Sequence, residues 1–134
     1  MEAIVYSKNI LVDESVIDHF NHVNNLVYVR WALEISKEHW NSFTTKDIQN
    51  TYGWMIMEHN LTYKRQAKLG DELVLNTHIQ DYSTATSVRK TELVFKESNQ
   101  LIFQSIAKWC FVKLDTQKPT RITEEIVKPF FKVS

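Results

Sequence analysis

The second half of the chain consists almost entirely of extended segments that follow one another across short connections. Four stretches rich in β-branched and aromatic residues lie at residues 54–65, 72–81, 84–96 and 101–114. Polar residues typical of turns, together with one Gly, dominate the connections. Connections this short join antiparallel neighbours, because parallel strands need a crossover of roughly a dozen residues or more. The four segments therefore predict one antiparallel sheet.

The first half of the chain adds one strand and a single long helix. Residues 3–12 have the composition of a strand, and the polar segment 13–25 predicts a loop. A helix is predicted from Asn24 or Asn25 to about Phe43, because Asn is a good N-cap and the segment contains neither Gly nor Pro. The order is thus strand, long helix and four strands.

Apolar side chains surround much of the circumference of this helix, so a wide surface must bury it. One antiparallel sheet wrapped around the helix meets this need and gives an α+β class. The outer strands of such a sheet would still need cover, and dimerisation through an edge strand supplies it. The two apolar helix faces carry Leu26, Val29, Leu33 and Trp40 on one side and Val27, Trp31 and Ile35 on the other.

Gly and Pro are scarce, with two of each in 134 residues, so little of the chain is available for linkers. Residues 44–53 are interpreted as a connector between helix and sheet. Residues 122–131 predict a short helix that ends before Pro129. The chain contains no repeat, and we expect a single domain spanning residues 1–134.

Charge and cysteine content exclude several function classes. The 16 Lys and Arg residues balance 16 Asp and Glu residues, which argues against a nucleic-acid partner. Cys110 is the only cysteine, so an intrachain disulfide and a multi-cysteine zinc site are excluded, and we expect it to be a small buried hydrophobe. The sequence begins without a signal-peptide pattern and has no apolar run long enough for a membrane span. We therefore expect a cytoplasmic protein without a membrane partner.

The loop before the helix concentrates polar residues that can carry chemistry. Asp18, His19, His22 and three Asn residues lie within residues 18–25, and the helix begins where this segment ends. A helix N-terminus offers unpaired N–H groups and partial positive charge, which stabilise a developing oxyanion. Asp18 can act as a general base or nucleophile, and His22 can orient a reactant or donate a proton. Hydrolysis of an activated acyl group is chemistry that suits this set.

Two motifs resemble a known family over nearly the whole chain. They are Asp18-x-x-x-His22-Val23-Asn24-Asn25-x-x-Tyr28 and Tyr63-x-Arg65-x-Ala67-x-x-Gly70-Asp71. The pair is similar to the hot-dog-fold acyl thioesterases of the 4-hydroxybenzoyl-CoA thioesterase superfamily. The first motif also resembles the second hot-dog repeat of plant acyl-carrier-protein thioesterases. The resemblance implies a hot-dog fold, in which an antiparallel sheet of about five strands wraps around one long central helix.

The resemblance also implies roles for individual residues. Asp18 falls where bacterial members keep their catalytic carboxylate, and the backbone N–H of Asn25 falls where the family polarises the thioester carbonyl. His22 matches the histidine of the plant-type motif. The chain departs from that motif at Phe20, where the plant-type pattern has Asn, and at Gln66, where it has Glu. Asp18 is thus the only acidic candidate in the motif.

Structural roles are the alternative for each of these residues. Asp18 can cap a turn, His22 can serve as a hydrogen-bonding scaffold, and Asn24 can order the loop. Tyr28 is expected to pack in the core or to form a wall of the acyl pocket, and Gln66 to hold a water molecule or the thioester or else to lie on the surface. We assign Asn24, Tyr28 and Gln66 to substrate binding.

The remaining polar residues give weaker signals. No third strong ligand joins Asp18, His19 and His22 at a familiar spacing, so we expect no metal. Strand alternation places only one of Glu58 and His59 toward the pocket. Basic residues on the strands could meet the phosphates of coenzyme A, although charges on the outer face of a sheet are usually solvated. These basic residues are Lys64, Arg65, Arg89 and Lys90.

The resemblance therefore predicts an acyl-CoA thioesterase that needs no cofactor other than the coenzyme A of its substrate. It implies a homodimer or homotetramer, with active sites at the dimer interface, and a place in fatty acid metabolism. A thioesterase acting on acyl-ACP, a hydratase or dehydratase, and a non-catalytic acyl-thioester-binding protein are the alternatives. Acyl chain length and the choice between direct attack and water activation by Asp18 stay open.

Overall fold

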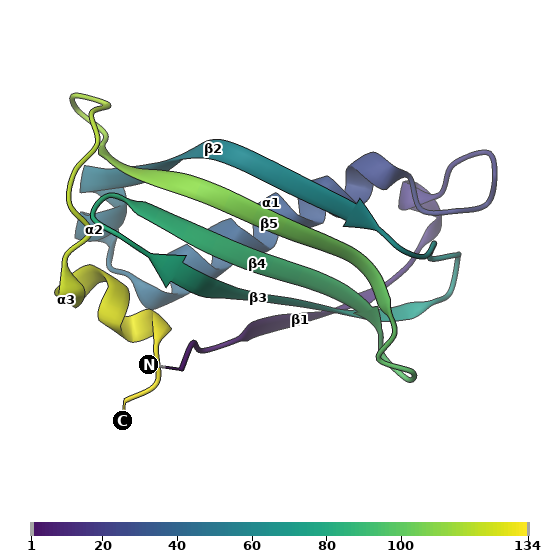
Figure 1. The fold of residues 1–134 in the computed structure, drawn as a ribbon. Coiled ribbons are helices and arrows are strands. Elements are labelled where there is room, and N and C mark those ends of the chain that lie inside the picture. The colour runs from purple at the N-terminus through teal and green to yellow at the C-terminus, as the bar shows by residue number, and fades with distance from the viewer. Residues whose placement is uncertain (1, 134) are drawn as a thin grey trace.

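The computed structural model describes residues 2–133 and contains one five-stranded antiparallel sheet with a long helix across one face (Figure 1). The strands are β1 (Tyr6–Leu11), β2 (Tyr52–Tyr63), β3 (Glu72–Tyr82), β4 (Thr86–Phe95) and β5 (Leu101–Lys113). Their order in the sheet is β1-β3-β4-β5-β2, and every neighbouring pair is antiparallel. The long helix is α1 (Asn25–Phe43). The predicted α+β class and the predicted sheet around a central helix are confirmed.

The predicted strands all form, with bounds that differ by a few residues. The second strand starts earlier than predicted, at Tyr52, and stops at Tyr63 rather than at residue 65. It stops there because the N–H groups of Lys64 and Arg65 both donate to the carbonyl of Ile102, at 2.8 and 3.1 Å. Two successive donors on one acceptor break the alternation that a strand ladder requires.

Short helices appear in three segments. The predicted connector contains α2 (Lys46–Thr51), whose first turn is capped by Thr45, because the Ile48 N–H donates to Thr45 Oγ1 at 3.3 Å. The loop before α1 contains a 3₁₀ turn at Glu14–Val16. The C-terminal helix α3 (Glu124–Val127) runs directly into a 3₁₀ turn at Lys128–Phe130.

The predicted short helix that ends before Pro129 is confirmed, because α3 ends at Val127. Pro129 lies inside the 3₁₀ turn at Lys128–Phe130, near its start. A proline is tolerated there because the first N–H groups of a helical turn have no acceptor within the turn.

Helix α1 buries one stripe of side chains against the sheet, rather than most of its circumference. Tyr28, Ala32, Ile35 and His39 on this stripe are almost completely buried. Leu26, by contrast, is 75% exposed and Leu33 39%, so much of the predicted apolar face that carries them is open, although Trp40 on the same face is buried. The sheet covers only one side of the helix, so the other side needs a different cover.

The core between α1 and the sheet has two separate hydrophobic clusters. The first lies toward the N-terminal half of α1 and includes Ile35, Leu75, Leu93 and Phe103. The second cluster lies toward the C-terminal half of α1 and consists of Trp40, Ile79, Phe111, Ile122, Ile126, Val127, Phe130 and Phe131.

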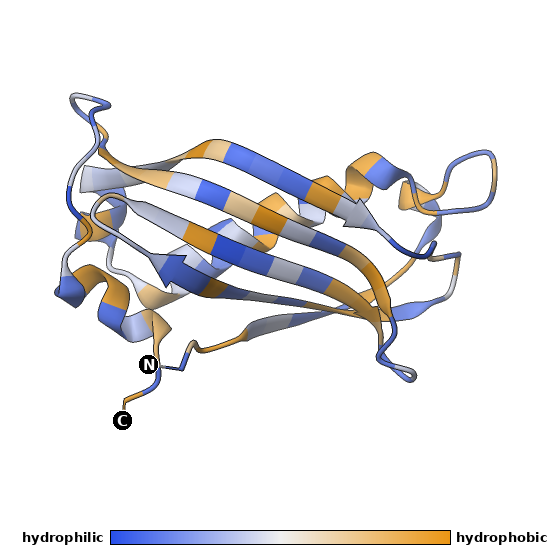
Figure 2. Ribbon diagram, viewed as in Figure 1, coloured by the Kyte–Doolittle hydropathy of each residue, from blue (hydrophilic) through white to orange (hydrophobic). Residues whose placement is uncertain are grey.

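Exposed connections at the ends of the sheet are mostly hydrophilic, whereas hydrophobic and hydrophilic residues mix along the strands (Figure 2).

Candidate functional site

The loop that carries Asp18 and His22 is a tight turn held by backbone hydrogen bonds. The Asp18 N–H donates to the His22 carbonyl at 2.8 Å, and the Asn21 N–H donates to the Asp18 carbonyl at 3.1 Å. Asn21 has φ 64°, in the left-handed region that Asn tolerates better than most residues. Ile17 and Val23 form an isolated antiparallel bridge at the base of the turn. Asp18 and His22 are therefore fixed next to each other.

The Asp18 carboxylate has one oxygen engaged and one oxygen available. Asp18 Oδ1 accepts hydrogen bonds from the N–H groups of Phe20 at 2.9 Å and His22 at 3.2 Å. This is the turn-capping geometry considered as the structural alternative. No residue among 2–133 donates a hydrogen bond to Asp18 Oδ2, so capping leaves that oxygen available to a reactant.

Helix α1 begins immediately after this turn, capped by Asn24. Asn24 Oδ1 accepts from the Leu26 N–H at 2.9 Å, and the Asn24 carbonyl accepts from the Val27 N–H at 2.9 Å. The Asn25 N–H finds no acceptor within the described part of the chain. An unpaired N–H at the positive end of a helix of 19 residues is suited to a developing oxyanion.

The backbone of Ala67, which follows β2, forms hydrogen bonds to the Asp18 loop and to helix α1. Its carbonyl accepts from the Val23 N–H at 2.9 Å, and its own N–H donates to the Tyr28 hydroxyl at 2.9 Å. Tyr28 is 1% exposed, and burial raises the pKa of its hydroxyl. Gln66, next to Ala67, is exposed. Tyr28 thus packs in the core of the isolated chain, and its predicted contact with substrate, like that of Gln66, stays a prediction.

Replacing Tyr28 with Phe is expected to lower the free energy of unfolding by about 1–3 kcal/mol. The substitution leaves the Ala67 N–H buried without an acceptor. Chemical denaturation measures the change. Tyr63→Phe is the matched control, because no hydrogen bond to the Tyr63 hydroxyl is found among residues 2–133, and it should change stability by less than about 0.5 kcal/mol. Equal effects of the two substitutions would contradict this role of Tyr28.

The structure brings the predicted residues to one end of the molecule but does not enclose them. His22 is half-buried, and Asn24, Asn25 and Gln66 are exposed. Within residues 2–133 no group of three or more His, Cys, Asp and Glu side chains could hold a metal ion. The candidate site is an open surface at the N-terminus of α1.

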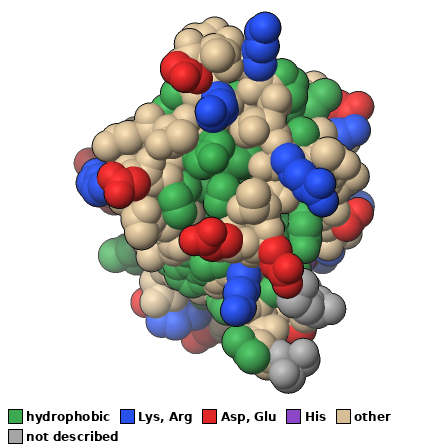
Figure 3. All heavy atoms as spheres, turned by 90° about the vertical axis from the view of Figure 1, so that its left-hand side faces the viewer, with side chains coloured by type: hydrophobic (Ala, Val, Ile, Leu, Met, Phe, Trp, Pro, Cys, Tyr) green, Lys and Arg blue, Asp and Glu red, His purple; other side chains and the backbone are tan. Residues whose placement is uncertain are grey.

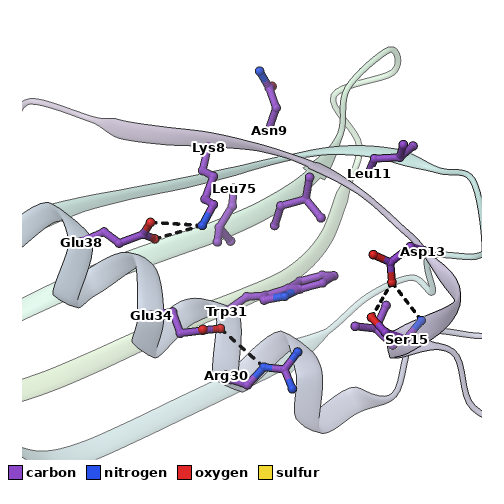
Figure 4. A pocket seen from close by; sticks show the side chains of 12 residues that line it. Lys8, Asn9, Leu11, Asp13, Ser15, Arg30, Trp31, Glu34, Glu38 and Leu75 are labelled. Carbon is purple, nitrogen blue, oxygen red and sulfur yellow. Dashed lines mark hydrogen bonds and ion pairs between the residues drawn. The ribbon is translucent and has the colours of Figure 1, made fainter.

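A cavity of about 400 Å³ lies between β1 and α1, with Trp31 at its base and charged side chains around it (Figure 4). One exposed ion pair joins β1 to α1, Lys8 to Glu38 at 3.1 Å, and a second, Arg30 to Glu34 at 3.5 Å, lies along α1. None of the candidate site residues lines it. Exposed pairs of this kind contribute little to stability, and we assign no function to this cavity.

A second cavity, of about 500 Å³, lies beside the C-terminal half of α1 and is lined by Arg89. Sequence patterns did not reveal its central feature, the buried side chain of Arg89. Arg89 does not lie on the outer face of the sheet, because it is only 7% exposed and points toward α1. Arg89 Nη1 donates to His39 Nδ1 at 2.9 Å and to Thr77 Oγ1 at 3.1 Å. The available signal was the alternation Ser87, Arg89, Thr91, Leu93, which places Arg89 on the same strand face as Leu93.

Arg89 also determines the state of His39. An arginine only donates, so His39 Nδ1 must accept and the ring proton lies on Nε2, which is buried without a hydrogen-bond partner among residues 2–133. Burial, together with the positive charge of Arg89 and of His78, lowers the pKa of His39 to about 3. Burial also lowers the pKa of Arg89, to about 10, which leaves it charged at neutral pH.

Two other predictions can be compared with the structure. His59 points toward α1, with its Nε2 2.7 Å from Ser105 Oγ, whereas Glu58 is exposed, as strand alternation predicted. Cys110 is half-buried rather than buried. None of the helices formed by residues 2–133 has the length and apolar character that crossing a bilayer requires.

The sheet wrapped around one helix defines a protein with the hot-dog fold, and solved structures show the same arrangement. A family described as the acyl-ACP thioesterase N-terminal domain matches residues 4–130, so the chain belongs to this family. No curated protein matches the chain.

Three solved structures illustrate the fold. A hypothetical protein from Staphylococcus aureus, solved in complex with CoA, is 20% identical with a TM-score of 0.86, over 96% of this chain and 83% of that one. A probable thioesterase from Escherichia coli is 19% identical with a TM-score of 0.79, over 94% of this chain and 98% of that one. The 12:0-ACP thioesterase from Umbellularia californica is 13% identical with a TM-score of 0.80, over 97% of this chain and 51% of that one. These likenesses establish the fold.

Proposed function

We propose that the chain is an acyl-CoA thioesterase that hydrolyses an acyl thioester to the free acid and coenzyme A. One observation carries the proposal. In a chain of the acyl-ACP thioesterase family, the same loop and helix start contain two polar groups that have no hydrogen-bond partner in the described part of the chain. Asp18 Oδ2 has no hydrogen-bond partner, and the N–H of Asn25 has no acceptor, among residues 2–133. One group can supply the base or nucleophile and the other the oxyanion contact.

In the proposed reaction the thioester carbonyl oxygen accepts a hydrogen bond from the Asn25 N–H. Asp18 then either removes a proton from an attacking water molecule or attacks the carbonyl carbon itself. The carbon–sulfur bond breaks and coenzyme A leaves as the thiolate. After direct attack, water hydrolyses the mixed anhydride and regenerates Asp18. The backbone hydrogen bonds of the turn hold Asp18 in place for either route.

The other motif residues receive supporting roles in this proposal. His22 lies beside Asp18 and is placed to orient the substrate or to donate a proton. Asn24 caps the helix and so fixes the direction of the Asn25 N–H. Gln66 is exposed next to Ala67, where it can contact the thioester or a water molecule, and Tyr28 supports this segment from below.

The carrier of the acyl group is proposed to be coenzyme A, with acyl carrier protein as the alternative. Two neighbours in fold favour coenzyme A, since the Staphylococcus aureus protein was solved with CoA and a Synechocystis neighbour is a 1,4-dihydroxy-2-naphthoyl-CoA thioesterase. The family's own description and the Umbellularia californica enzyme favour acyl-ACP. Release of free thiol from matched octanoyl-CoA and octanoyl-ACP tests both.

A non-catalytic acyl-binding protein is the second candidate function, favoured by Gln66 in place of the Glu of the plant-type motif. The same assay distinguishes it. Tight acyl-CoA binding to folded protein with no thiol release from any substrate would overturn the proposed hydrolysis.

We further propose that two copies pair along β2 to form a homodimer. Strand β2 is an edge strand, and its Ile56 and Leu61 lie on the face toward α1, opposite Trp109 and Ser105 of β5, yet they are 44% and 37% exposed. Antiparallel pairing of two β2 strands would bring the Tyr52 end of one copy beside the Tyr63 end of the other. The Tyr63 end adjoins the candidate site, so the second copy would help to enclose this site.

Placing Lys at positions 56 and 61 is expected to halve the mass of the particle in solution. Inward-pointing charges on an edge strand oppose pairing with another strand. Light scattering coupled to gel filtration measures the mass of Ile56→Lys/Leu61→Lys. Leu11→Lys, on the exposed face of the opposite edge strand β1, is the control and should leave the mass unchanged. A native protein that is already monomeric, or a variant that stays dimeric, would exclude pairing through β2.

A further inference from the structure

The cavity beside the C-terminal half of α1 contains a buried positive charge that no protein group neutralises. Arg89 is 7% exposed, and no carboxylate among residues 2–133 forms an ion pair with it. Its protein partners, His39 and Thr77, are neutral and both bond to Nη1. The N–H groups of Nε and Nη2 have no partner among the described residues, so they are available to a ligand. A buried charge is normally paired, which indicates an anionic group from outside the chain.

The wall of this cavity is aromatic and carries positive charge only. Lys37 and Arg89 are its charged lining residues, and neither Asp nor Glu lines it. Seen from this end of the molecule, hydrophobic side chains gather in the middle of the face, with charged side chains around them (Figure 3). The aromatic lining residues are Trp40, Tyr52, Trp54 and Trp109. Nε1 of Trp109 is buried without a hydrogen-bond partner in residues 2–133, so it adds a donor beside the guanidinium.

The proposed pairing along β2 places this cavity beside the candidate site of the second copy. Tyr52 and Trp54, which line the cavity, lie at the start of β2. In an antiparallel pair this end meets the Tyr63 end of the other copy, which adjoins the Asp18 loop because Val23 donates to the Ala67 carbonyl. A thioester at the Asp18 loop of one copy can therefore extend its acyl group into the Arg89 cavity of the other copy.

We propose that the substrate is a thioester of a dicarboxylic acid, whose free carboxylate binds Arg89 of one copy while Asp18 of the other copy acts on the thioester. This inference rests on the proposed hydrolysis and on the proposed pairing, and it adds the chemical class of the acyl group. The guanidinium fork matches the two oxygens of a carboxylate, and the aromatic wall covers the methylene groups between the two ends. An ordinary fatty acyl group would place a methyl group against the guanidinium and leave its charge unpaired.

The first test compares CoA thioesters of equal chain length with and without a terminal carboxylate. The pairs are adipyl-CoA with hexanoyl-CoA, suberyl-CoA with octanoyl-CoA, and sebacyl-CoA with decanoyl-CoA. In at least one pair, kcat/KM for thiol release is expected to be at least ~10-fold higher for the thioester with the carboxylate, because its hydrogen bonds to Arg89 join two charged groups. A pocket without a counter-charge would give the opposite order, since burying an unpaired carboxylate is costly. Hydrolysis without this preference in any pair would overturn the inference and leave the proposed function standing.

The second test assigns the preference to Arg89. Arg89→Met is expected to reverse the preference in the most selective pair, whereas Arg121→Met, which removes an exposed arginine, should preserve it. Thermal melting checks that Arg89→Met folds. Retention of the preference in folded Arg89→Met would overturn the role of Arg89.

A complete absence of hydrolysis would overturn the proposed function, and binding then tests the inference by itself. Titration calorimetry compares the affinities of the same pairs for the native protein. The thioester with the carboxylate is expected to bind at least ~10-fold more tightly in at least one pair. Equal affinities within every pair would overturn the inference.

The third test asks whether the two residues act across the interface. Mixed dimers of Asp18→Asn and Arg89→Met are isolated by carrying a different affinity tag on each copy. One site of such a dimer combines native Asp18 with native Arg89 of the other copy, and the second site carries both substitutions. The mixed dimer is therefore expected to hydrolyse the preferred thioester at about half the native rate, well above either variant alone. A mixed dimer no faster than the faster of the two variants would overturn the placement of both residues at one site.

Discussion

Asp18→Asn is expected to lower kcat for thioester hydrolysis by at least ~100-fold, which corresponds to about 2.7 kcal/mol of transition-state stabilisation. The amide oxygen of Asn can still accept from the N–H groups of Phe20 and His22, so the turn should persist. What the substitution removes is the carboxylate oxygen that the turn leaves available. Steady-state thiol release with octanoyl-CoA measures the loss, and circular dichroism checks the fold.

Asp13→Asn is the matched control for this experiment. Asp13 also caps a turn near the start of the chain, because its Oδ1 accepts from the N–H and hydroxyl of Ser15. It has no place in the proposed reaction, so the control should keep kcat within a few-fold of the native value. Full activity in Asp18→Asn, or an equal loss in both variants, would exclude Asp18 as the base or nucleophile.

Acidification from pH 7 to pH 5 is expected to destabilise the protein by about 2 kcal/mol through His39 alone. The pKa of His39 is about 3 in the folded protein, below the usual 6.5 of an unfolded chain. The unfolded chain therefore binds the extra proton first. The stability is fully present above pH 6.5 and is lost as the pH falls toward 3, at up to about 1.4 kcal/mol per pH unit.

His39→Asn tests this prediction, since an Asn oxygen can still accept from Arg89 but does not titrate. Chemical denaturation at pH 5, 6 and 7 should show a flatter pH dependence in this variant than in the native protein. Burial also lowers the pKa values of His59 and His78, which add a slope of the same sign to both proteins. His19→Asn, which changes an exposed histidine, should keep the native slope. An unchanged slope in His39→Asn would contradict a neutral buried His39.

Sequence patterns were sufficient to predict the fold, because the spacing of apolar residues and the positions of turn-forming residues indicate the same elements along most of the chain. The alternation of Leu73, Leu75 and Ile79 fixed the buried face of β3, and Asn24 marked the start of α1. Helix α2 was not predicted, because six residues are too few to show the repeat of apolar residues that identifies a helix. The only sequence signal for this helix was the capping residue Thr45. Leu26 was predicted to be covered, but the chain folds with it exposed because the sheet reaches only one side of α1.

The candidate site was predicted from one local motif, which is why its members lie together. Asp18, His22 and Asn25 are close in sequence, and a single turn joins them to the helix. Arg89 could not be found in this way. Its partners, Thr77 and His39, come from another strand and from the helix, and only the packed sheet brings them together. A charged residue on a strand is ordinarily assigned to solvent, and the alternation along β4 indicates only which face Arg89 shares, not the partners that it meets there.

The division of the core into two hydrophobic clusters affects how this chain can change over time. Along β3, Leu75 belongs to one cluster and Ile79 to the other, and the buried polar Thr77 lies between them. Substitutions with no shared contacts usually have additive effects. The two ends of the molecule can therefore be remodelled one at a time, and a lineage can alter the Arg89 cavity while the packing beneath the Asp18 loop is inherited intact.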